Sequence, residues 1–201
     1  MEFKNGPRFK SLSLHDQPVA ESDHFIALPS LGSVVKGWML IVPKAPLLCY
    51  ADLDRSLLAE FDRFAQQVAD HLRGMYGEVL LFEHGARTAG SSFGCGVDQA
   101  HMHIVPVSSD RFVHAVEFEI ARPEWRSFGN RFPNQALLGE YLWYRTDKGS
   151  MMTNPVRPTS QFFRRCVANA VGRPSEWNYR DHPNYVRIVE TVNDYGRAEA
   201  V

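Results

Sequence analysis

The stretch Gln99-Ala100-His101-Met102-His103-Ile104 decides the fold, because polar and apolar residues alternate along it without a break. A β-strand sends successive side chains to opposite faces of its sheet. The three apolar residues are therefore predicted to face a hydrophobic core, while Gln99, His101 and His103 share the other face. Two imidazoles spaced in this way can both reach one phosphate group or one metal ion.

A Gly- and Ser-rich segment, Gly90-Ser91-Ser92-Phe93-Gly94-Cys95-Gly96, leads into this strand. Such a loop can bring backbone N–H groups close to an anion, because glycine imposes little steric restriction on the backbone. Ser92, Gly94 and Gly96 are therefore predicted to bind substrate. The alternative is purely structural, with two histidines buried side by side and hydrogen-bonded within the protein.

The composition of the 201 residues is that of a globular protein, with 44% hydrophobic and 22% charged residues. The formal net charge of −1 gives no bulk attraction to nucleic acid or to an anionic membrane. No apolar run is long enough to cross a membrane. The three cysteines are widely spaced and form no CxxC pair, which supports neither a zinc ribbon nor a disulfide framework. We expect a cytoplasmic protein with neither nucleic acid nor membrane as a partner.

Hydrophobic periodicity predicts the elements around the histidine strand. A helix is expected from Asp52 or Asp54 to about Arg73, with one apolar stripe that faces a sheet. A later helix is expected over 158–171, with Thr159 or Ser160 as its N-cap. The other expected strands are 25–28, 34–42, 78–84, 140–146 and 151–156, and the other expected helices are 108–115 and 184–194.

Three segments, GWMLIVPK (37–44), FEHG (82–85) and QAHMHIVP (99–106), occur in an order that resembles the histidine triad (HIT) superfamily. The resemblance is clearest over residues 23–107. The remainder resembles the C-terminal extension of a larger bacterial branch. The resemblance implies an α+β fold, with an antiparallel sheet, a long helix and a C-terminal α/β extension. It divides the chain into a catalytic core of 1–115 and an extension of 116–201 packed on that core.

The resemblance also implies a nucleotide hydrolase or nucleotidyltransferase that acts at a nucleotide α-phosphate through a nucleotidyl-histidine intermediate. His101 matches the nucleophile of the family motif, and His103 matches the last of its three histidines. Gln99 stands in place of the first. Trp38 stands where another family histidine usually follows the glycine of the 37–44 segment.

The chemistry explains these residue types, because a neutral imidazole is nucleophilic near pH 7 and leaves readily from phosphorus. We expect a backbone carbonyl to hold the second ring nitrogen of His101, and His103 to donate to a phosphate oxygen. Gln99 can donate through its amide but cannot shuttle a proton. His84 is either a replacement acid or a residue that only hydrogen-bonds the loop.

Four further residues are predicted to bind substrate. Trp38 either lines a nucleoside pocket or belongs to the core. Ser160 and Gln161 open a helix whose N-terminus could meet an anion, with Arg164 one turn further on. The alternative for Arg164 is an exposed, arginine-rich helix face.

Two rival functions remain open from the sequence. One is a catalytically weak nucleotide-binding protein, since Gln99 and Trp38 replace family histidines. The other is a cupin-like metal enzyme that uses His101 and His103, although Pro106–Ser109 supplies no glutamate for such a site. Third and fourth ligands at a usable spacing are missing from the sequence, so we expect no metal and no cofactor. The expected partner is a nucleotide or nucleoside phosphate, with a homodimer as the candidate assembly.

Overall fold

The core of the protein is one antiparallel sheet, ordered β1-β2-β3-β5-β4-β7-β8-β6 among the described residues. The computed structural model describes residues 14–94, 96–119, 124–129, 132–133, 139–155 and 159–198. The strands are β1 (Ala20–Glu21), β2 (Phe25–Pro29), β3 (Met39–Pro43), β4 (Val79–Gly85), β5 (Met102–Pro106), β6 (Arg126–Gly129), β7 (Tyr141–Thr146) and β8 (Gly149–Thr153).

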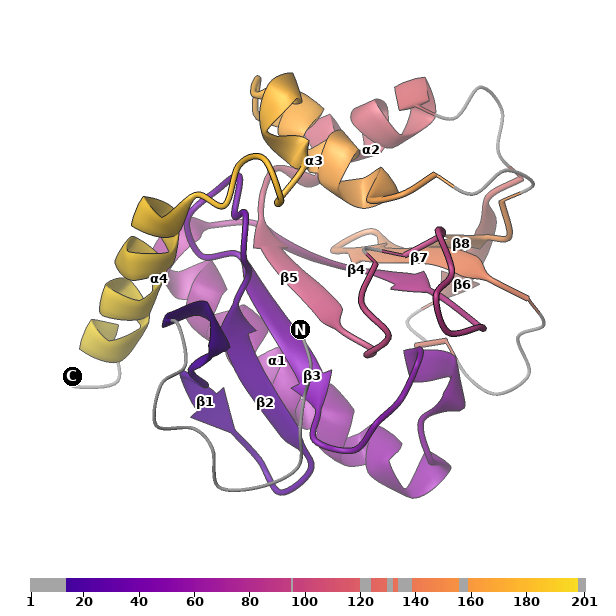
Figure 1. Ribbon diagram of the computed structural model, residues 1–201, viewed down its shortest axis with the longest axis horizontal. Coiled ribbons are helices and arrows are strands. Elements are labelled where there is room, and N and C mark those ends of the chain that lie inside the picture. The colour runs from indigo at the N-terminus through magenta and orange to yellow at the C-terminus, as the bar shows by residue number, and fades with distance from the viewer. Residues whose placement is uncertain are drawn as a thin grey trace.

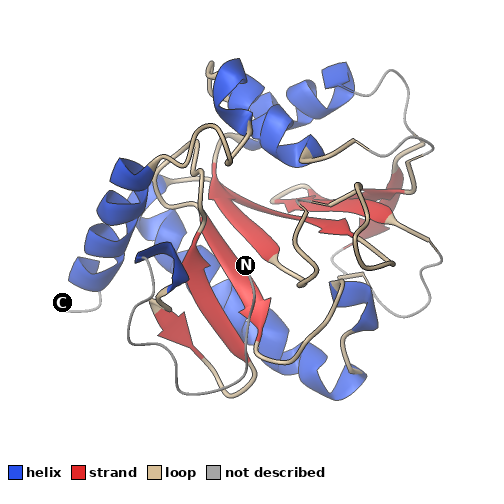
Figure 2. Ribbon diagram, viewed as in Figure 1, coloured by secondary structure: helices blue, strands red, loops and turns tan. Residues whose placement is uncertain are grey.

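Helices cover both faces of this sheet (Figures 1 and 2). The long α1 packs on one face, α2 and α3 lie together over the other, and α4 runs beside the edge that carries β1 and β2. The helices are α1 (Leu58–Tyr76), α2 (Ser109–Glu119), α3 (Phe162–Ala170) and α4 (Tyr185–Ala198), with short 3-10 turns at Leu14–Asp16, Tyr50–Asp52, Arg55–Leu57 and Pro174–Trp177. The expected α+β fold with an antiparallel sheet and a long helix is confirmed.

The alternation of side chains divides the apolar residues of the sheet into two cores. Met102 and Ile104 of β5 lie in the core beneath α1, as predicted. Phe82 of β4 lies in the second core, beneath α2 and α3. The face that carries His103 is therefore covered by the C-terminal part of the chain, which the alternation alone does not reveal.

The first helix forms where its apolar stripe predicts it. Phe61, Phe64, Val68 and Leu72 are buried against the sheet, and the opposite side of the helix is polar. The Asp54 carboxylate accepts the backbone N–H of Ser56, which starts the 3-10 turn that leads into α1. The predicted start is thus correct to within a turn.

Two local predictions are wrong. The expected strand 34–42 is regular only from Met39, because the chain before it turns through Gly37 at φ 77°. The expected N-cap at Thr159 or Ser160 is replaced by Gln161, which adopts a left-handed conformation with φ 57° and makes no side-chain capping bond.

The C-terminal residues continue the same sheet rather than forming a separate layer. Strand β7 pairs with β4, and β8 and β6 extend the sheet beyond it. A boundary at residue 115 falls inside α2. The division into 1–115 and 116–201 therefore describes sequence segments, and it stays a prediction as a domain organisation.

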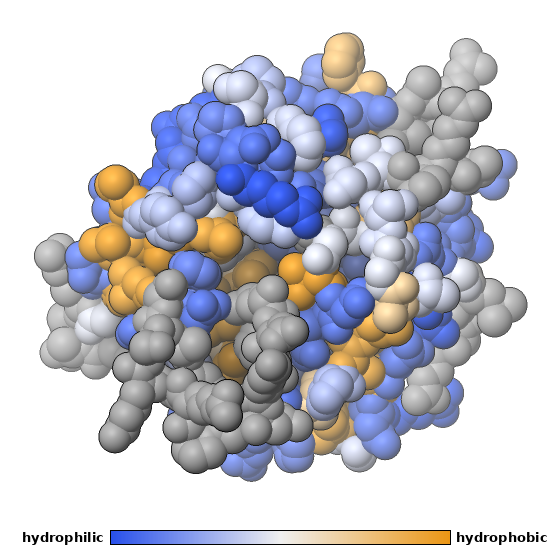
Figure 3. Space-filling view, viewed as in Figure 1, coloured by the Kyte–Doolittle hydropathy of each residue, from blue (hydrophilic) through white to orange (hydrophobic). Residues whose placement is uncertain are grey.

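Exposed apolar side chains gather on one helix. Figure 3 shows apolar surface over α4, where Val186 and Val189 remain exposed. Among the described residues, no helix has both the length and the apolar character that a membrane span requires.

Candidate active site

His101 immediately precedes β5, where the chain leaves the Gly-rich loop and enters the sheet. Its ring Nδ1 lies 2.8 Å from the backbone carbonyl oxygen of Gln99. A carbonyl oxygen only accepts hydrogen bonds, so Nδ1 carries the proton of the neutral ring and Nε2 carries the lone pair. The expected backbone carbonyl is present, and Nε2 is the nitrogen free to act as a nucleophile.

His103 lies on the same side of the sheet and is only 2% exposed. The indole Nε1–H of Trp38 donates to its Nδ1 at 2.9 Å, which assigns the proton of the neutral ring to Nε2. That Nε2–H is buried and has no hydrogen-bond partner among the described residues. The ring centroids of His101 and His103 are 4.9 Å apart. His103 thus offers one oriented donor beside the candidate nucleophile.

Both imidazoles are held neutral. Burial lowers the pKa of His101 below its ordinary value; the hydrogen bond to the Gln99 carbonyl opposes this shift, and the positive charge of Arg164 adds to it. Burial also lowers the pKa of His103 well below its ordinary value, and the charges of neighbouring histidines and Arg164 act in the same direction. A neutral His101 is the form that can attack phosphorus.

His84 lies near the end of β4, and its ring centroid is 6.2 Å from that of His103. Its Nε2 accepts the backbone N–H of Phe163 at 3.0 Å. Burial, together with the charges of His101 and Arg164, lowers the pKa of His84 to about 3. The ring is therefore a neutral acceptor that joins β4 to the first turn of α3, which favours the alternative of a hydrogen-bonding role.

Gln99 is buried, and its side chain is hydrogen-bonded to the backbone at the end of β3 and just after it. Its side-chain amide donates to the carbonyl oxygens of Pro43 at 2.9 Å and Ala45 at 3.1 Å. An amide nitrogen carries two hydrogens, so both are engaged. Neither remains for a substrate phosphate, and the side chain has no proton to exchange.

Arg164 is buried in the first turn of α3, and its guanidinium donates to neutral oxygen atoms of Ser30, Leu31, Gly32 and Trp177. Its guanidinium also lies 4.6 Å from the centre of the Trp38 ring. A buried positive charge near the histidines favours anions in the site. The exposed arginine-rich face considered from the sequence is therefore wrong for Arg164.

The comparisons with known proteins bear on this site. The family model for the HIT domain matches residues 12–110, which include both histidines, Gln99 and Trp38. The protein belongs to the histidine triad superfamily. No curated protein is similar enough to match the chain.

Several solved structures resemble this histidine triad protein over less than half of its length. A hypothetical histidine triad nucleotide-binding protein from Sulfolobus tokodaii is 24% identical, with a TM-score of 0.39, over 46% of this chain and 60% of its own. A Hit-like protein involved in cell-cycle regulation from Bartonella henselae is 23% identical, with a TM-score of 0.38, over 44% of this chain and 67% of its own. A HIT family member from Bacillus subtilis is 24% identical, with a TM-score of 0.38, over 44% of this chain and 62% of its own.

The Gly-rich loop of the HIT domain lies against the C-terminal part of the chain. Ser92 is exposed, whereas Gly94 is buried and its carbonyl accepts the hydroxyl of Ser160 at 3.3 Å. Gly96 has φ 74°, and a Cβ on it would lie 2.7 Å from the Arg180 guanidinium. Cys95 lies outside the described residues. The loop and the Ser160 segment predicted to bind an anion are thus adjacent.

Gln161, the residue before α3, combines two unusual features. It is non-glycine with a positive φ of 57°, and its buried Oε1 has no hydrogen-bond partner among the described residues. Its amide nitrogen donates to Asn178 at 3.2 Å. A left-handed backbone in a buried non-glycine residue is characteristic of functional sites. The role of Gln161 in substrate binding stays a prediction.

Trp38 is fully buried and contacts His103 rather than an open pocket. Trp38 therefore acts on the site through its hydrogen bond to the His103 imidazole. The sequence reasoning missed this hydrogen bond, and it also missed Arg180 beside Gly96 and Tyr179, whose ring lies next to the Arg180 guanidinium. Only the replacement of a family histidine by Trp38 signalled that this position was altered.

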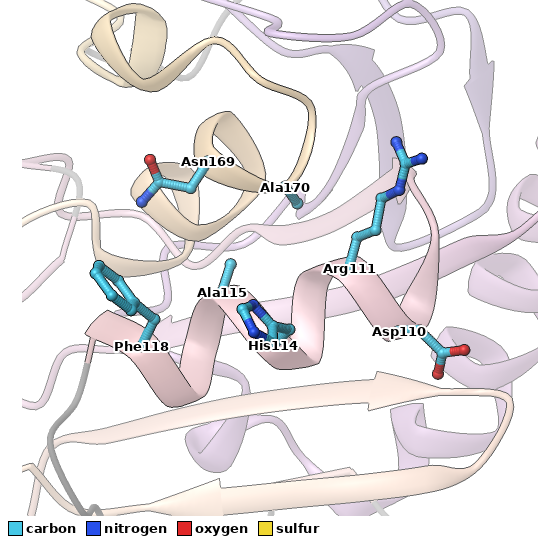
Figure 4. A pocket seen from close by; sticks show the side chains of 7 residues that line it. All are labelled: Asp110, Arg111, His114, Ala115, Phe118, Asn169 and Ala170. Atoms are coloured by element: carbon cyan, nitrogen blue, oxygen red, sulfur yellow. The ribbon is translucent and has the colours of Figure 1, made fainter.

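A surface hollow of about 510 Å³ lies elsewhere, between α2 and α3. Figure 4 shows Asp110, Arg111, His114 and Phe118 along α2 and Asn169 on α3 around it. None of the candidate site residues lines this hollow. Within the described ranges, no group of three or more His, Cys, Asp or Glu side chains could hold a metal ion.

Proposed function

We propose that this histidine triad protein is a nucleotide hydrolase or nucleotidyltransferase that acts at the α-phosphate of a nucleotide, with His101 as the nucleophile. One observation carries the proposal. His101 presents a deprotonated Nε2 beside the unpaired Nε2–H of the buried His103. The pair combines a nucleophile with a donor for a non-bridging phosphate oxygen.

In the first step, the Nε2 lone pair of His101 forms a bond to the α-phosphorus, and the bond from phosphorus to the leaving-group oxygen breaks. The leaving group departs with that electron pair. The proton on Nδ1 stays hydrogen-bonded to the Gln99 carbonyl. The nucleotidyl-imidazole is then cationic, which makes its N–P bond easy to break in the second step.

In the second step, water or another acceptor attacks phosphorus and His101 leaves with the lone pair on Nε2. The His103 N–H and the nearby positive charge of Arg164 stabilise the negative charge that builds on the phosphoryl oxygens. Positioning and charge stabilisation are the main requirements of phosphoryl transfer, so these groups suffice for the chemistry.

Gln99, His84 and His103 offer the leaving group no mobile proton. Both Gln99 amide hydrogens are engaged, and His84 and His103 are neutral rings whose pKa values burial lowers. A basic leaving group needs protonation as it departs. The proposed substrates are therefore those whose leaving groups depart as weakly basic anions.

The proposal is tested by single-turnover trapping with radiolabelled nucleotides. Wild-type protein is expected to form an acid-labile adduct on the peptide that carries His101. His101→Ala is expected to lose both adduct and turnover while it stays folded. His114→Ala, a matched change at an exposed histidine of α2, is expected to retain both. Substantial turnover by His101→Ala, or label on a serine, would contradict the mechanism.

A matched pair of substrates separates turnover from binding alone. A nucleoside phosphoanhydride and a phosphoramidate of an alkyl amine share the nucleotide and differ in the basicity of the leaving group. We expect the anhydride to be turned over much faster. Nucleotide binding with no adduct from either substrate would favour a binding protein, for which the replacement of family histidines by Gln99 and Trp38 is the specific argument.

A further inference from the structure

We propose that Arg180 binds the anionic leaving group of the substrate, which makes nucleoside phosphoanhydrides with charge beyond the α-phosphate the preferred substrate class. This inference rests on the proposed function. It adds a specificity-determining residue from the C-terminal part of the chain, outside residues 12–110 that match the HIT domain.

The position of the guanidinium is the first argument. Its Nη2 would lie 2.7 Å from a Cβ on Gly96, so it lies directly against the backbone of the Gly-rich loop. A side chain at this position would displace the Arg180 guanidinium, and the φ of 74° at Gly96 favours glycine. The five residues from Gly96 to His101 span at most about 17 Å of extended chain. Arg180 thus borders the loop that leads directly to the nucleophile.

A series of side-chain contacts also connects Arg180 to the histidines. The Arg180 guanidinium lies 5.1 Å from the Tyr179 ring, and the Arg164 guanidinium lies 5.7 Å from that ring. Arg164 in turn lies over Trp38, whose indole holds His103. This series of contacts connects Arg180 to the donor histidine His103. The two positive charges, Arg164 and Arg180, therefore lie on either side of the Tyr179 contact that links the Gly-rich loop to Trp38.

The backbone of Arg180 is anchored while its side chain is exposed. Asn178 Oδ1 accepts the backbone N–H of Arg180 at 3.3 Å and also the amide of Gln161 at 3.2 Å. These bonds tie the Arg180 turn to the beginning of α3. Across the part of the chain that the structure describes, no hydrogen bond or ion pair of the Arg180 guanidinium is seen.

Two neighbouring arginines, unlike Arg180 within the described residues, have hydrogen-bond or ion-pair partners for their guanidinium groups. Arg173 donates to the Val34 carbonyl, and Arg187 is paired with Glu176. Those guanidiniums are occupied in holding the chain together. Arg180 instead presents a planar, permanently charged group that can bind phosphate through two parallel hydrogen bonds. A phosphate or pyrophosphate leaving group supplies the matching oxygens.

The test compares substrates that differ only in the charge of the leaving group. Adenosine and guanosine triphosphates are compared with the 4-nitrophenyl esters of the corresponding monophosphates, whose leaving group carries no phosphate and needs no proton. Arg180→Gln is expected to lower kcat/KM for the triphosphates about tenfold or more. The nitrophenyl esters are expected to change by less than about threefold. Arg180→Lys keeps the charge but loses the paired hydrogen bonds of the guanidinium. Its kcat/KM for the triphosphates is expected to lie between those of wild type and Arg180→Gln.

A binding measurement accompanies the kinetics. Calorimetric titration with inorganic pyrophosphate is expected to show an affinity about tenfold weaker for Arg180→Gln than for wild type. Arg111→Gln, an equal loss of charge at an exposed site on α2, is expected to leave both measurements unchanged. Equal losses on both substrate types, or pyrophosphate binding that is insensitive to Arg180→Gln, would overturn the inference. Wild-type protein that binds pyrophosphate through Arg180 yet forms no His101 adduct would overturn the proposed function instead.

Discussion

Trp38→Phe removes one hydrogen-bond donor from the centre of the site while it keeps an aromatic ring in the core. The indole Nε1–H that donates to His103 Nδ1 at 2.9 Å is lost, and Trp38 is fully buried. The acceptor nitrogen of His103 is then left without its partner. The imidazole becomes free to move its proton from Nε2 to Nδ1, which would remove the donor beside His101.

The expected loss of stability has two parts. The smaller ring leaves a cavity, which costs about 1 kcal/mol for the missing indole volume at roughly 24 cal/mol per Å³. A buried acceptor without a partner adds about 1–3 kcal/mol. The total for Trp38→Phe is therefore about 2–4 kcal/mol, of which the hydrogen bond accounts for about 1–3 kcal/mol.

Trp143 provides a matched control. It is also fully buried, but it lies in the core beneath α1, and its Nε1 has no hydrogen-bond partner among the described residues. Trp143→Phe therefore produces a similar cavity without loss of a hydrogen bond. Urea denaturation of both variants isolates the bond as the difference, expected at about 1–3 kcal/mol.

Turnover provides the second measurement. Trp38→Phe is expected to lower the rate of adduct formation about tenfold or more, because His103 no longer has a single orientation and tautomer. Trp143→Phe should leave this rate close to that of wild type. Equal stability losses in the two variants, together with unchanged rates, would refute the role assigned to the bond between Trp38 and His103.

Three further predictions follow from burial and close packing. Burial lowers the pKa of His84 to about 3 and that of His103 well below 6.5, so below pH 6.5 the unfolded chain binds more protons than the folded one. Through these histidines the free energy of unfolding should fall from pH 7 to pH 5 in denaturant titrations, by about 2 kcal/mol for His84, and the buried Glu83, whose pKa is raised to about 7, opposes this fall. Because the pKa of His101 is also lowered, kcat/KM should stay level as the pH falls through 6.5 and decline only at lower pH; a decline centred above 6.5 would contradict the burial argument. Gly85→Ala should destabilise the protein by about 1–3 kcal/mol in thermal unfolding, because the new Cβ would overlap the ring of Tyr141.

The sequence predicted features that repeat over short distances along the chain. Alternation between residues 99 and 104 assigned Met102 and Ile104 to the core beneath α1 and put His103 on the opposite face. The apolar stripe of α1 was predicted from its helical periodicity, because a helix of a globular protein is stable only when one of its faces is buried. The contact between His101 and the Gln99 carbonyl joins residues two apart, so local reasoning could anticipate it.

Contacts between distant residues were decided only by the tertiary structure. Trp38 meets His103 across 65 positions, and His84 meets Phe163 across 79. These bonds assign the histidine tautomers and occupy nitrogens that the sequence left open for proton transfer. The first depends on the pairing of β3 with β5 and the second on how α3 covers the sheet, and both are matters of global packing rather than of local periodicity. The sequence by itself thus determined which side chains share a face, and only the folded chain decided which of their atoms remain free to react.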